Sequence, residues 1–491
     1  MMHPIPNDIR LTGPLKPMRF EVDIEDCIVH GEIPRSLNGG FYRVGPTLKH
    51  IPRDGALGFP AMDGMVQAMI FDNGKATFRN RWVRTPKFLA EEKAGEAIFQ
   101  FEDNWPDWRG MCIGEVVRDE RTSGIQQGNA GVNVVPFGNR EILALCEQGL
   151  PPIALDPITL ETKGLVPWAR RCGRGLVDPP CAEGGAFTAH PKWDAGTGEL
   201  YGWSFWDREP YLTVHFVQPD GAVRSRVVED APYYANLHDA WLTEEFVVMP
   251  FQPFVNTLDR IKQGYGFPVL GWEPDRPIKL AIIPRDLQGD IRWVTADFGP
   301  EYVMHTMSAN TVGDQLILDG PIFDKAPFPF EQDLKPGEDF VPFGAGVTGR
   351  WTVDLASGTC KSERLDDRPV EFPKVDERFY GKGYETGFMT GGNDLWSLTT
   401  VIKRNVRTGS EERYHVERDL PIAIFEPTFA ARHADAPEGD GYLIVPVSRF
   451  AENCSEYLIF DTQGIDAGPI ATIELPVQIG WTPHGHFMDL A

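Results

Sequence analysis

Short apolar segments separated by glycine-containing turns recur along most of the chain. In the clearest case, residues 68–71 and 75–78 are rich in apolar and strand-forming side chains and flank Asp-Asn-Gly at 72–74. An Asn-Gly pair between two such segments is typical of a two-residue β-hairpin turn. Similar segments surround the turns at 219–221 and 356–358, and the pattern continues from near residue 40 to near residue 475. The sequence therefore predicts many short antiparallel strands.

Helical patterns are rare in this chain. One helix is expected within 85–101, and a second, shorter one at 255–263. No change in composition marks a linker, so we expect a single domain spanning residues 1–491. Antiparallel units repeated over this length favour an all-β fold of the β-propeller type, in which radial repetition leaves only short sheet edges. A pair of β-sandwich domains is the alternative, and the periodicity does not fix the number of blades.

Composition supports a globular protein with many turns. Of the 491 residues, 50 are Gly and 42 are Pro, which favours short elements over long helices. The net charge of −24, without a cluster of Lys or Arg, argues against nucleic acid or an anionic membrane surface as a partner. We find no segment with the length and apolarity of a membrane-spanning helix and no signal-peptide pattern at the start. The seven cysteines never form a Cys-x-x-Cys pair, which favours a reducing cytoplasm.

Four of the eleven histidines stand in distinctive settings: His190, His238, His305 and His484. They lie too far apart in the sequence for a local zinc motif, in which ligand pairs are separated by a few residues. In a propeller, separate blades could each bring one of them to a site on the central axis. Imidazole binds Zn, Cu, Fe and Ni, so the residue type does not choose the metal. Each histidine alone could equally cap a turn or fill a polar niche.

A set of short motifs also lies in a fixed order along nearly the whole chain. The motifs are Gly31-Glu-Ile-Pro34, Leu37 to Pro46, Met62-Asp-Gly-Met-Val66, Leu143 to Glu147, Asp156 to Thr162, Phe187-Thr-Ala-His-Pro191, Glu371-Phe-Pro373, Phe425-Glu-Pro427, and Pro476 followed by His484-Gly485. In this order and spacing they resemble the carotenoid cleavage oxygenase family. One departure is Met62, which stands where that family usually has Gly.

The resemblance implies a seven-bladed β-propeller with a dome of loops and short helices over the iron-bearing face. It implies that four axial histidines, His190, His238, His305 and His484, bind Fe(II). His486 is the rival for the fourth position. We favour His484 because the following glycine and the distance from Pro476 match the family pattern.

The same resemblance assigns three glutamates, Glu147, Glu371 and Glu426, to positions behind the ligands. A neutral imidazole that binds a metal through one nitrogen needs an acceptor for its other N–H, which fixes the tautomer and the ring orientation. Four neutral histidines leave up to two positions on a six-coordinate iron for O2 beside a substrate. The implied reaction is oxidative cleavage of a conjugated C=C bond into carbonyl products, with O2 as cosubstrate.

Several segments look closer to the bacterial stilbene- and phenylpropanoid-cleaving branch than to the carotenoid enzymes, among them 280–285 and 436–442. A small hydrophobic aromatic alkene is therefore the expected substrate. The sequence also has no amphipathic apolar insert that would draw carotenoids from a membrane, so no stable membrane insertion is expected.

The residues expected around the substrate are Phe59, Phe101, Glu102, Asn129 and Cys146. Cys146 stands where that branch has a Lys that grips a substrate phenol, and Phe101 or Glu102 stands where it has a Tyr. Asn129 begins the segment that replaces Thr-Ala-Asn-Thr near the O2 site. These replacements favour a substrate without a free 4-hydroxyl, or one that is bound by other residues.

Other functions are compatible with parts of the pattern. The family also contains apocarotenoid-cleaving enzymes and iron-dependent isomerases with the same ligands. From other classes, a catalytically silent propeller would bind a ligand or partner, and a propeller hydrolase or lactonase would hold Ca2+ with carboxylate and amide oxygens. The complete set of four His and three Glu argues against a silent scaffold, and the imidazoles argue against Ca2+. We expect a monomer or a homodimer.

Overall fold

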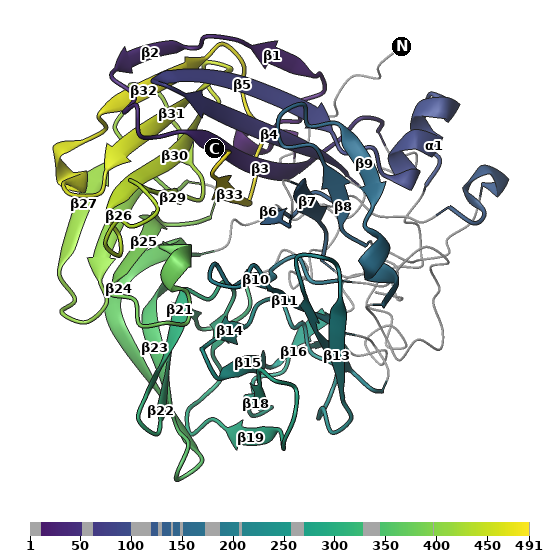
Figure 1. Ribbon diagram of the computed structural model, residues 1–491, viewed down its shortest axis with the longest axis vertical. Coiled ribbons are helices and arrows are strands. Elements are labelled where there is room, and N and C mark those ends of the chain that lie inside the picture. Colours follow the sequence, from purple (N-terminus) through teal and green to yellow (C-terminus); the bar gives the residue numbers. More distant parts are fainter. Residues whose placement is uncertain are drawn as a thin grey trace, which may run out of the picture.

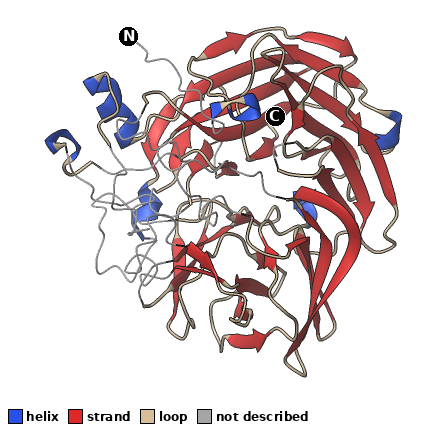
Figure 2. Ribbon diagram, turned by 180° about the vertical axis from the view of Figure 1, so that it is seen from behind, coloured by secondary structure: helices blue, strands red, loops and turns tan. Residues whose placement is uncertain are grey.

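The computed structural model describes residues 11–51, 62–99, 119–125, 130–138, 141–147, 151–171, 187–205, 209–256, 270–327, 344–395 and 397–490. Within these ranges the chain forms antiparallel sheets that surround a common axis (Figure 1). Helical segments are short and lie mostly at the periphery (Figure 2). The expectation of an all-β propeller is confirmed.

The sheets divide into seven blades, numbered here from the one that contains both ends of the described chain. Blade one comprises β33 (His484–Met488), β3 (Gly39–Thr47), β4 (Asp63–Asp72), β5 (Lys75–Trp82) and β1 (Val22–Ile24). Blade two comprises β6 (Asn133–Phe137), β7 (Glu141–Leu145), β8 (Ile153–Leu155) and β9 (Thr162–Leu165). Blade three comprises β10 (Lys192–Trp193), β11 (Leu200–Phe205), β12 (Leu212–Val217) and β13 (Val223–Val228). Blade four comprises β14 (Trp241–Leu242), β15 (Phe246–Phe251), β18 (Lys279–Pro284) and β19 (Arg292–Thr295).

The remaining blades share one long strand, β24 (Thr359–Val375). Its first part pairs with β23 (Gly346–Asp354) in blade five, next to β22 (Gln315–Phe323), β20 (Tyr302–Val303) and β21 (Ser308–Val312). Its last part pairs in blade six with β25 (Thr386–Gly391), which is followed by β26 (Thr400–Asn405) and β27 (Glu411–His415). Blade seven comprises β28 (Ala423–Ile424), β29 (Thr428–Ala431), β30 (Gly441–Arg449), β31 (Cys454–Asp461), β32 (Ala471–Leu475) and β2 (Ile28–Gly31). The eight-stranded sheet is thus two blades joined by β24, which gives the seven that the resemblance implied.

Two strand pairings between early and late parts of the chain close the ring. In blade one, β3 pairs with β33, and Val44 lies opposite His484. In blade seven, β2 pairs with β32, and Ile28 lies opposite Glu474. Because both closures are antiparallel ladders, the strand that carries His484 is held by main-chain hydrogen bonds to a strand near the start of the chain.

Local turn and helix signals agree with the structure in most places. Asn73 and Gly74 have φ of 48° and 85°, as a type I′ hairpin turn requires. The expected helix within 85–101 is α1 (Pro86–Ala94), which Thr85 caps by accepting a hydrogen bond from the Phe88 amide. The helix expected at 255–263 is wrong for its first residues, since Phe254–Asn256 is strand β16, paired with β17 (Leu270–Trp272). The five 3₁₀ helices within the described ranges are η2 (Gly13–Leu15), η5 (Glu120–Thr122), η6 (Pro167–Arg171), η8 (Glu377–Phe379) and η9 (Ile465–Ala467).

A buried charge cluster fastens α1 to blade one. Lys87 Nζ lies 2.8 Å from Asp63 Oδ1 and 2.9 Å from Glu91 Oε2, and all three side chains are only 3% exposed. Glu91 also accepts hydrogen bonds from the amides of Ile98 and Phe99. Buried charges are tolerated when each has a partner, and here each carboxylate contacts the same ammonium.

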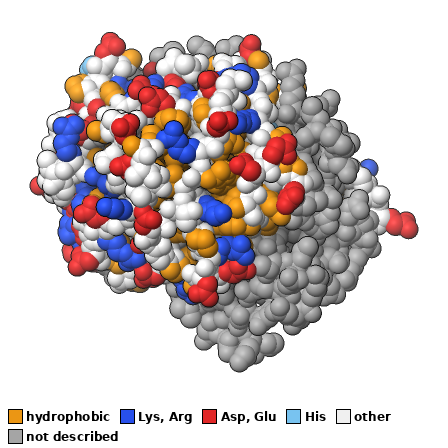
Figure 3. All heavy atoms as spheres, turned by 90° about the horizontal axis from the view of Figure 1, so that it is seen from below, with side chains coloured by type: hydrophobic (Ala, Val, Ile, Leu, Met, Phe, Trp, Pro, Cys, Tyr) orange, Lys and Arg blue, Asp and Glu red, His pale blue; other side chains and the backbone are white. Residues whose placement is uncertain are grey.

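The outer surface carries charges of both signs. Seen from below, acidic and basic side chains are dispersed around a central strip of hydrophobic ones (Figure 3). In the part of the chain that the structure describes, no helix has both the length and the apolar character that a membrane span needs. The expected dome of loops and short helices stays a prediction, because several long connections lie outside the described residues.

Candidate metal centre

The four predicted histidines come from four different blades. His190 lies two residues before β10, His238 lies three residues before β14, and His305 lies between β20 and β21. His484 is the first residue of β33. All of these strands lie on the axial side of their blades (Figure 1), so residues distant in sequence meet near the centre of the ring.

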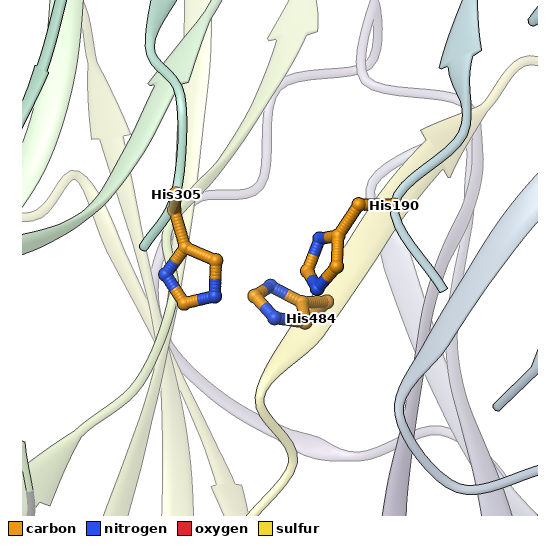
Figure 4. A group of neighbouring side chains, drawn as sticks. All are labelled: His190, His305 and His484. Carbon is orange, nitrogen blue, oxygen red and sulfur yellow. The ribbon is translucent and has the colours of Figure 1, made fainter. Parts of the chain in front are cut away.

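The imidazoles face one another on the axis. His190, His305 and His484 each offer a nitrogen, and these nitrogens all lie within 4.8 Å of one another (Figure 4). His238 joins them, since its Nε2 lies 3.3 Å from Nε2 of His305 and its ring centroid lies 4.3 Å from that of His190. Two adjacent ligands with metal–nitrogen bonds of about 2.0–2.1 Å have nitrogens about 3 Å apart. The spacing of His238 and His305 is therefore close to that of two neighbouring ligands of one ion.

Three buried glutamates accept hydrogen bonds from the other nitrogen of three rings. His238 Nδ1 lies 2.8 and 2.9 Å from the two carboxylate oxygens of Glu147. His305 Nδ1 donates to Glu371 at 2.7 Å, and His484 Nδ1 donates to Glu426 at 2.9 Å.

These contacts select the tautomer of each ring. Because a carboxylate accepts, Nδ1 of each ring carries a proton, and in the neutral ring Nε2 keeps its lone pair. Nε2 of His238 and Nε2 of His305 lie 3.3 Å apart, so two neutral rings would point their lone pairs at each other, which a proton or a metal ion between them relieves. Imidazole nitrogens that point toward one common position are the arrangement expected of metal ligands.

His190 differs from the other three histidines, since none of the described glutamates accepts a hydrogen bond from its ring. Its Nε2 is buried and makes no hydrogen bond among the described residues. A buried polar atom without a partner is costly, and coordination of a metal ion would remove that cost. The site therefore fits an ion held by imidazole nitrogens.

Burial keeps most of the imidazoles neutral, as metal ligands must be. It lowers the pKa of His305 to about 3 and that of His484 to about 4, and it lowers the pKa of His190 well below its ordinary value. Burial also acts to lower the pKa of His238, but the charge of Glu147 outweighs it and raises that pKa. Three of the four rings are thus uncharged at neutral pH even without an ion.

The glutamates are not equivalent electrostatically. Glu371 is fully buried, and burial raises its pKa to about 8. Burial would do the same at Glu426, but Lys374 and His484 hold its pKa well below the ordinary value. The Lys374 ammonium lies 3.3 Å from Glu426 Oε2. A divalent cation among the imidazoles would balance the charge of the carboxylates that lack such a partner.

The backbone around Glu371 is unusual. Phe372 has a φ of 53°, in the left-handed region that bulky side chains rarely adopt, and the pairing of β24 with β25 is irregular between Glu371 and Lys374. The Phe372 amide donates to the Glu371 carboxylate, and its ring stacks on His305 at a centroid distance of 5.7 Å. This irregularity aims the carboxylate toward His305, and such bulges commonly re-aim a side chain near a functional site.

The four histidines and three glutamates of the site are distributed over all seven blades. Blades three, four, five and one supply His190, His238, His305 and His484. Blades two, six and seven supply the three glutamates, which lie after β7, on β24 and between β28 and β29. Each blade contributes one residue, and His190 is the histidine left without a carboxylate.

A cavity of about 70 Å3 is lined in part by His190, His305 and His484. Its lining includes Lys192, Asp239, Thr306, Lys374 and Tyr380. None of these was predicted from the sequence, although three of them lie within two residues of a predicted ligand. For these three, the signal available in the sequence was a polar residue within two positions after a predicted ligand.

The other predicted positions have different outcomes. His486 also lines the cavity, but its Nδ1 lies 2.9 Å from Glu377, and it does not belong to the histidine cluster. Cys146 is buried in an apolar cluster, and its thiol lies 3.6 Å from the Glu147 carbonyl oxygen. The remaining pocket positions, Phe59, Phe101, Glu102 and Asn129, lie outside the described residues.

Comparisons with known proteins give relatives over the full length. Residues 15–489 match the family described as retinal pigment epithelial membrane protein. Isoeugenol monooxygenase of Pseudomonas nitroreducens is 33% identical, with 98% of each chain covered. Lignostilbene-alpha,beta-dioxygenase isozyme III of Sphingomonas paucimobilis is 30% identical, with 99% of this chain and 98% of the relative covered. The crystal structure of Pseudomonas brassicacearum lignostilbene dioxygenase superposes with a TM-score of 0.85 at 30% identity, covering 99% of this chain and 100% of the other.

Proposed function

Because this chain belongs to the retinal pigment epithelial membrane protein family, also known as the carotenoid oxygenase family, we propose that it is an oxygenase of alkenes. It cleaves a conjugated C=C bond of an aromatic alkene with O2 and releases carbonyl products. The resemblance inferred from the ordered motifs is confirmed by this membership. One structural observation carries the proposal: His238 and His305 aim their Nε2 atoms at each other across 3.3 Å, each with a glutamate behind it.

The cofactor is Fe(II), held by His190, His238, His305 and His484. When bound, the iron activates O2 for reaction with the alkene. The donor set supports this choice, because four imidazoles without a carboxylate ligand suit a late first-row metal better than Mg2+ or Ca2+. The orphaned Nε2 of His190 and the facing nitrogens of His238 and His305 are the observations that favour a single ion.

The protein's own residues prepare the site before any substrate arrives. Glu147, Glu371 and Glu426 hold the Nδ1 protons, so the three rings present Nε2 to the axis and keep their orientation. All four histidines are at most 5% exposed, which limits access of bulk water to the reacting centre. These residues orient ligands and exclude solvent, and none of them needs to transfer a proton, because cleavage of an alkene by O2 into two carbonyls is balanced without one.

The proposed substrate is a small aromatic alkene of the stilbene or phenylpropanoid type. Three relatives at 30–33% identity are named for isoeugenol and lignostilbene, which are both aromatic alkenes. An apocarotenoid is the second candidate and is less favoured, since the apocarotenoid-15,15'-oxygenase of Synechocystis is 28% identical. Cys27, Cys146, Cys360 and Cys454 form no disulfide with one another, which favours a reducing cytoplasm as the location.

The decisive experiment pairs metal analysis with product analysis. The purified protein is incubated aerobically with Fe(II) and a panel of stilbenes, phenylpropenes and apocarotenoids, and products are identified by mass. His238→Ala should lose bound iron and activity together while the protein stays folded, whereas His415→Ala, a change on the peripheral strand β27, should keep both. Full activity in an iron-free His238→Ala protein would refute the proposed mechanism.

Two further measurements separate the alternatives. Labelling with 18O2 distinguishes cleavage from isomerisation, because only an oxygenase places the label in its products. His484→Ala and His486→Ala distinguish the two candidates for the fourth ligand, since only loss of the true ligand should weaken iron binding. A protein that binds no iron and consumes no O2 with any alkene would instead be a binding scaffold.

A further inference from the structure

The residues that follow the ligands in sequence meet beside the metal site. Lys192 lies two residues after His190, Asp239 directly follows His238, and Thr306 directly follows His305. All three residues line the same cavity. Since these residues come from three blades, their side chains can connect ligand segments that share no main-chain hydrogen bonds.

Asp239 is the centre of these connections. Its Oδ1 lies 2.5 Å from Lys192 Nζ and accepts a hydrogen bond from the Ala240 amide at 2.7 Å. Its Oδ2 accepts from the amide and from the hydroxyl of Thr306 at 2.8 and 3.0 Å. Thr306 directly follows His305. One buried carboxylate, 4% exposed, thus ties together the segments that carry His190, His238 and His305.

Tyr380 completes the network from blade six. Its hydroxyl oxygen lies 3.2 Å from Thr306 Oγ1, and Lys192 Nζ lies 5.5 Å from the centroid of its ring. The Thr306 hydroxyl proton is directed to Asp239 or to the Ala240 carbonyl, so the Tyr380 hydroxyl donates to Thr306. The order of donation therefore runs from Tyr380 to Thr306 to Asp239.

The same segment also reaches the strand of the fourth histidine. Tyr380 directly follows η8, and Glu377 of η8 accepts a hydrogen bond from His486 on β33. Lys374, a little earlier in the chain, donates to the Gly485 carbonyl at 3.1 Å. Segment 374–380 thus touches three of the four ligand segments directly and reaches that of His238 through Thr306 and Asp239.

His190 needs this support most, because no glutamate in the described part of the chain lies behind its ring. Its position depends on the main chain on either side. Asn133 donates to the Ala189 carbonyl at 2.9 Å, and Lys192 is held by Asp239. For the other three histidines a carboxylate fixes the ring itself, whereas for His190 the neighbouring side chains must fix the backbone that carries it.

We propose that Asp239 and Tyr380 are positioning residues, which brace the ligand segments from the cavity side and set the geometry of the four-histidine site. The inference rests on the proposed function only in that the histidines bind a divalent metal. Neither residue is one of the four predicted metal ligands. The brace acts through Lys192 on His190 and through Thr306 on His305.

Two variants test the brace, with one matched control. Tyr380→Phe removes a hydroxyl and keeps the ring near Lys192, and Asp239→Asn removes the central charge. Tyr384→Phe is the control, because Tyr384 is a buried tyrosine of the same connection, and its hydroxyl donates to Asp319 at 2.6 Å, away from the cavity. If Asp239→Asn does not fold, Tyr380→Phe decides the question.

The readouts separate positioning from simple stability. Affinity for Fe(II) is measured by competition with a chelator, ligand geometry by the visible spectrum of the Co(II)-substituted protein, and fold stability by the Tm of the metal-free protein. Both brace variants should weaken Fe(II) binding by roughly 10- to 100-fold, as loss of groups behind metal ligands commonly does, and should shift the Co(II) bands. With an alkene that the enzyme cleaves, kcat should fall while KM changes little. The control should change the Tm alone.

Each remaining outcome has a definite meaning. Unchanged Fe(II) affinity and Co(II) spectrum in both brace variants would overturn the proposal, even if their Tm falls. A wild-type protein that binds neither Fe(II) nor Co(II) would overturn it together with the proposed function. A wild-type protein that binds Co(II) but cleaves no alkene would refute the proposed function alone, and the spectra of the variants would still decide whether the brace exists.

Discussion

Nε2 of His238 and Nε2 of His305 lie 3.3 Å apart, and Glu147 and Glu371 accept the protons on the opposite nitrogens of the two rings. In two neutral rings the lone pairs at this distance would repel each other, and a proton or a metal ion between them removes that repulsion. The folded protein therefore holds this pair in a geometry that an ion stabilises, and the predictions about the site follow from that relationship.

Glu147 should control the affinity for metal through His238. Replacing it by Gln leaves an acceptor of weaker basicity at the same place, so Glu147→Gln should weaken Fe(II) binding by roughly 10- to 100-fold. Chelator competition measures the change. Glu141→Gln, a change at a partly exposed residue of the preceding strand β7, is the control and should leave the affinity unaltered. Equal affinities in both variants would mean that Glu147 has no role in holding the ring.

Cys146 tests the predicted substrate pocket. Cys146→Lys introduces an ammonium that can pair with a phenol, so activity toward 4-hydroxystilbenes should rise relative to their 4-methoxy analogues. Cys146→Met adds comparable length without charge, and it separates the effect of the ammonium from that of volume. The thiol is only 3% exposed, so the new ammonium would need the phenol as its partner. No change in the preference for phenols would place the pocket elsewhere.

The buried cluster around Lys87 should contribute strongly to stability. Lys87→Met removes the shared partner of Asp63 and Glu91 and leaves two buried carboxylates, which should lower the free energy of unfolding by about 3–5 kcal/mol. Urea denaturation measures the loss. Lys75→Met removes an exposed Lys that pairs with Asp26 and should change stability by no more than about 0.5 kcal/mol. A similar small effect at Lys87 would show that the cluster is solvated.

Asp194 should make the stability of the fold depend on pH. Burial acts to raise its pKa, but hydrogen bonds from Arg285 at 2.9 Å and Lys382 at 3.1 Å hold that pKa at about 2. Because the folded-state pKa lies below the ordinary 3.8, the ionised carboxylate stabilises the fold above that pH, and the contribution is lost as the pH falls toward 2. Asp194→Asn should therefore be less stable at pH 7 and lose less stability on acidification.

Urea titrations at several pH values between 7 and 2 check the Asp194 prediction. Asp324→Asn is the control, since Asp324 is 86% exposed and pairs with the surface residue Arg364. Its pH dependence should match that of the unaltered protein. If Asp194→Asn also follows the unaltered curve, the carboxylate is not the source of the linkage.

Much of the fold could be predicted because its signals are local. Asn73-Gly74 specifies its hairpin through the backbone freedom of those two residues, and Thr85 marks the start of α1 through its cap. The error at Val255 shows the limit of such signals. That residue belongs to a strand because it pairs with Gly271, a partner that no short window around 255–263 contains.

The candidate site was likewise predictable from the sequence only in part. The motif order was enough to assign the histidines and glutamates to a family pattern, and the structure brings those residues together. Lys374 and Tyr380 were missed because their roles arise from contacts with Glu426 and Thr306, which lie on other blades. Such contacts depend on how the blades are arranged around the axis, and a linear pattern does not contain that information.

The pairing of β3 with β33 has a consequence for how the active protein is made. Three of the histidines belong to blades that can form from segments close together in the sequence. His484 takes its place only when β33 pairs with β3, a strand from the early part of the chain. Pairings between distant segments form slowly during folding. The complete set of ligands thus exists only after the ring has closed. We therefore expect iron to bind after folding and not to initiate it.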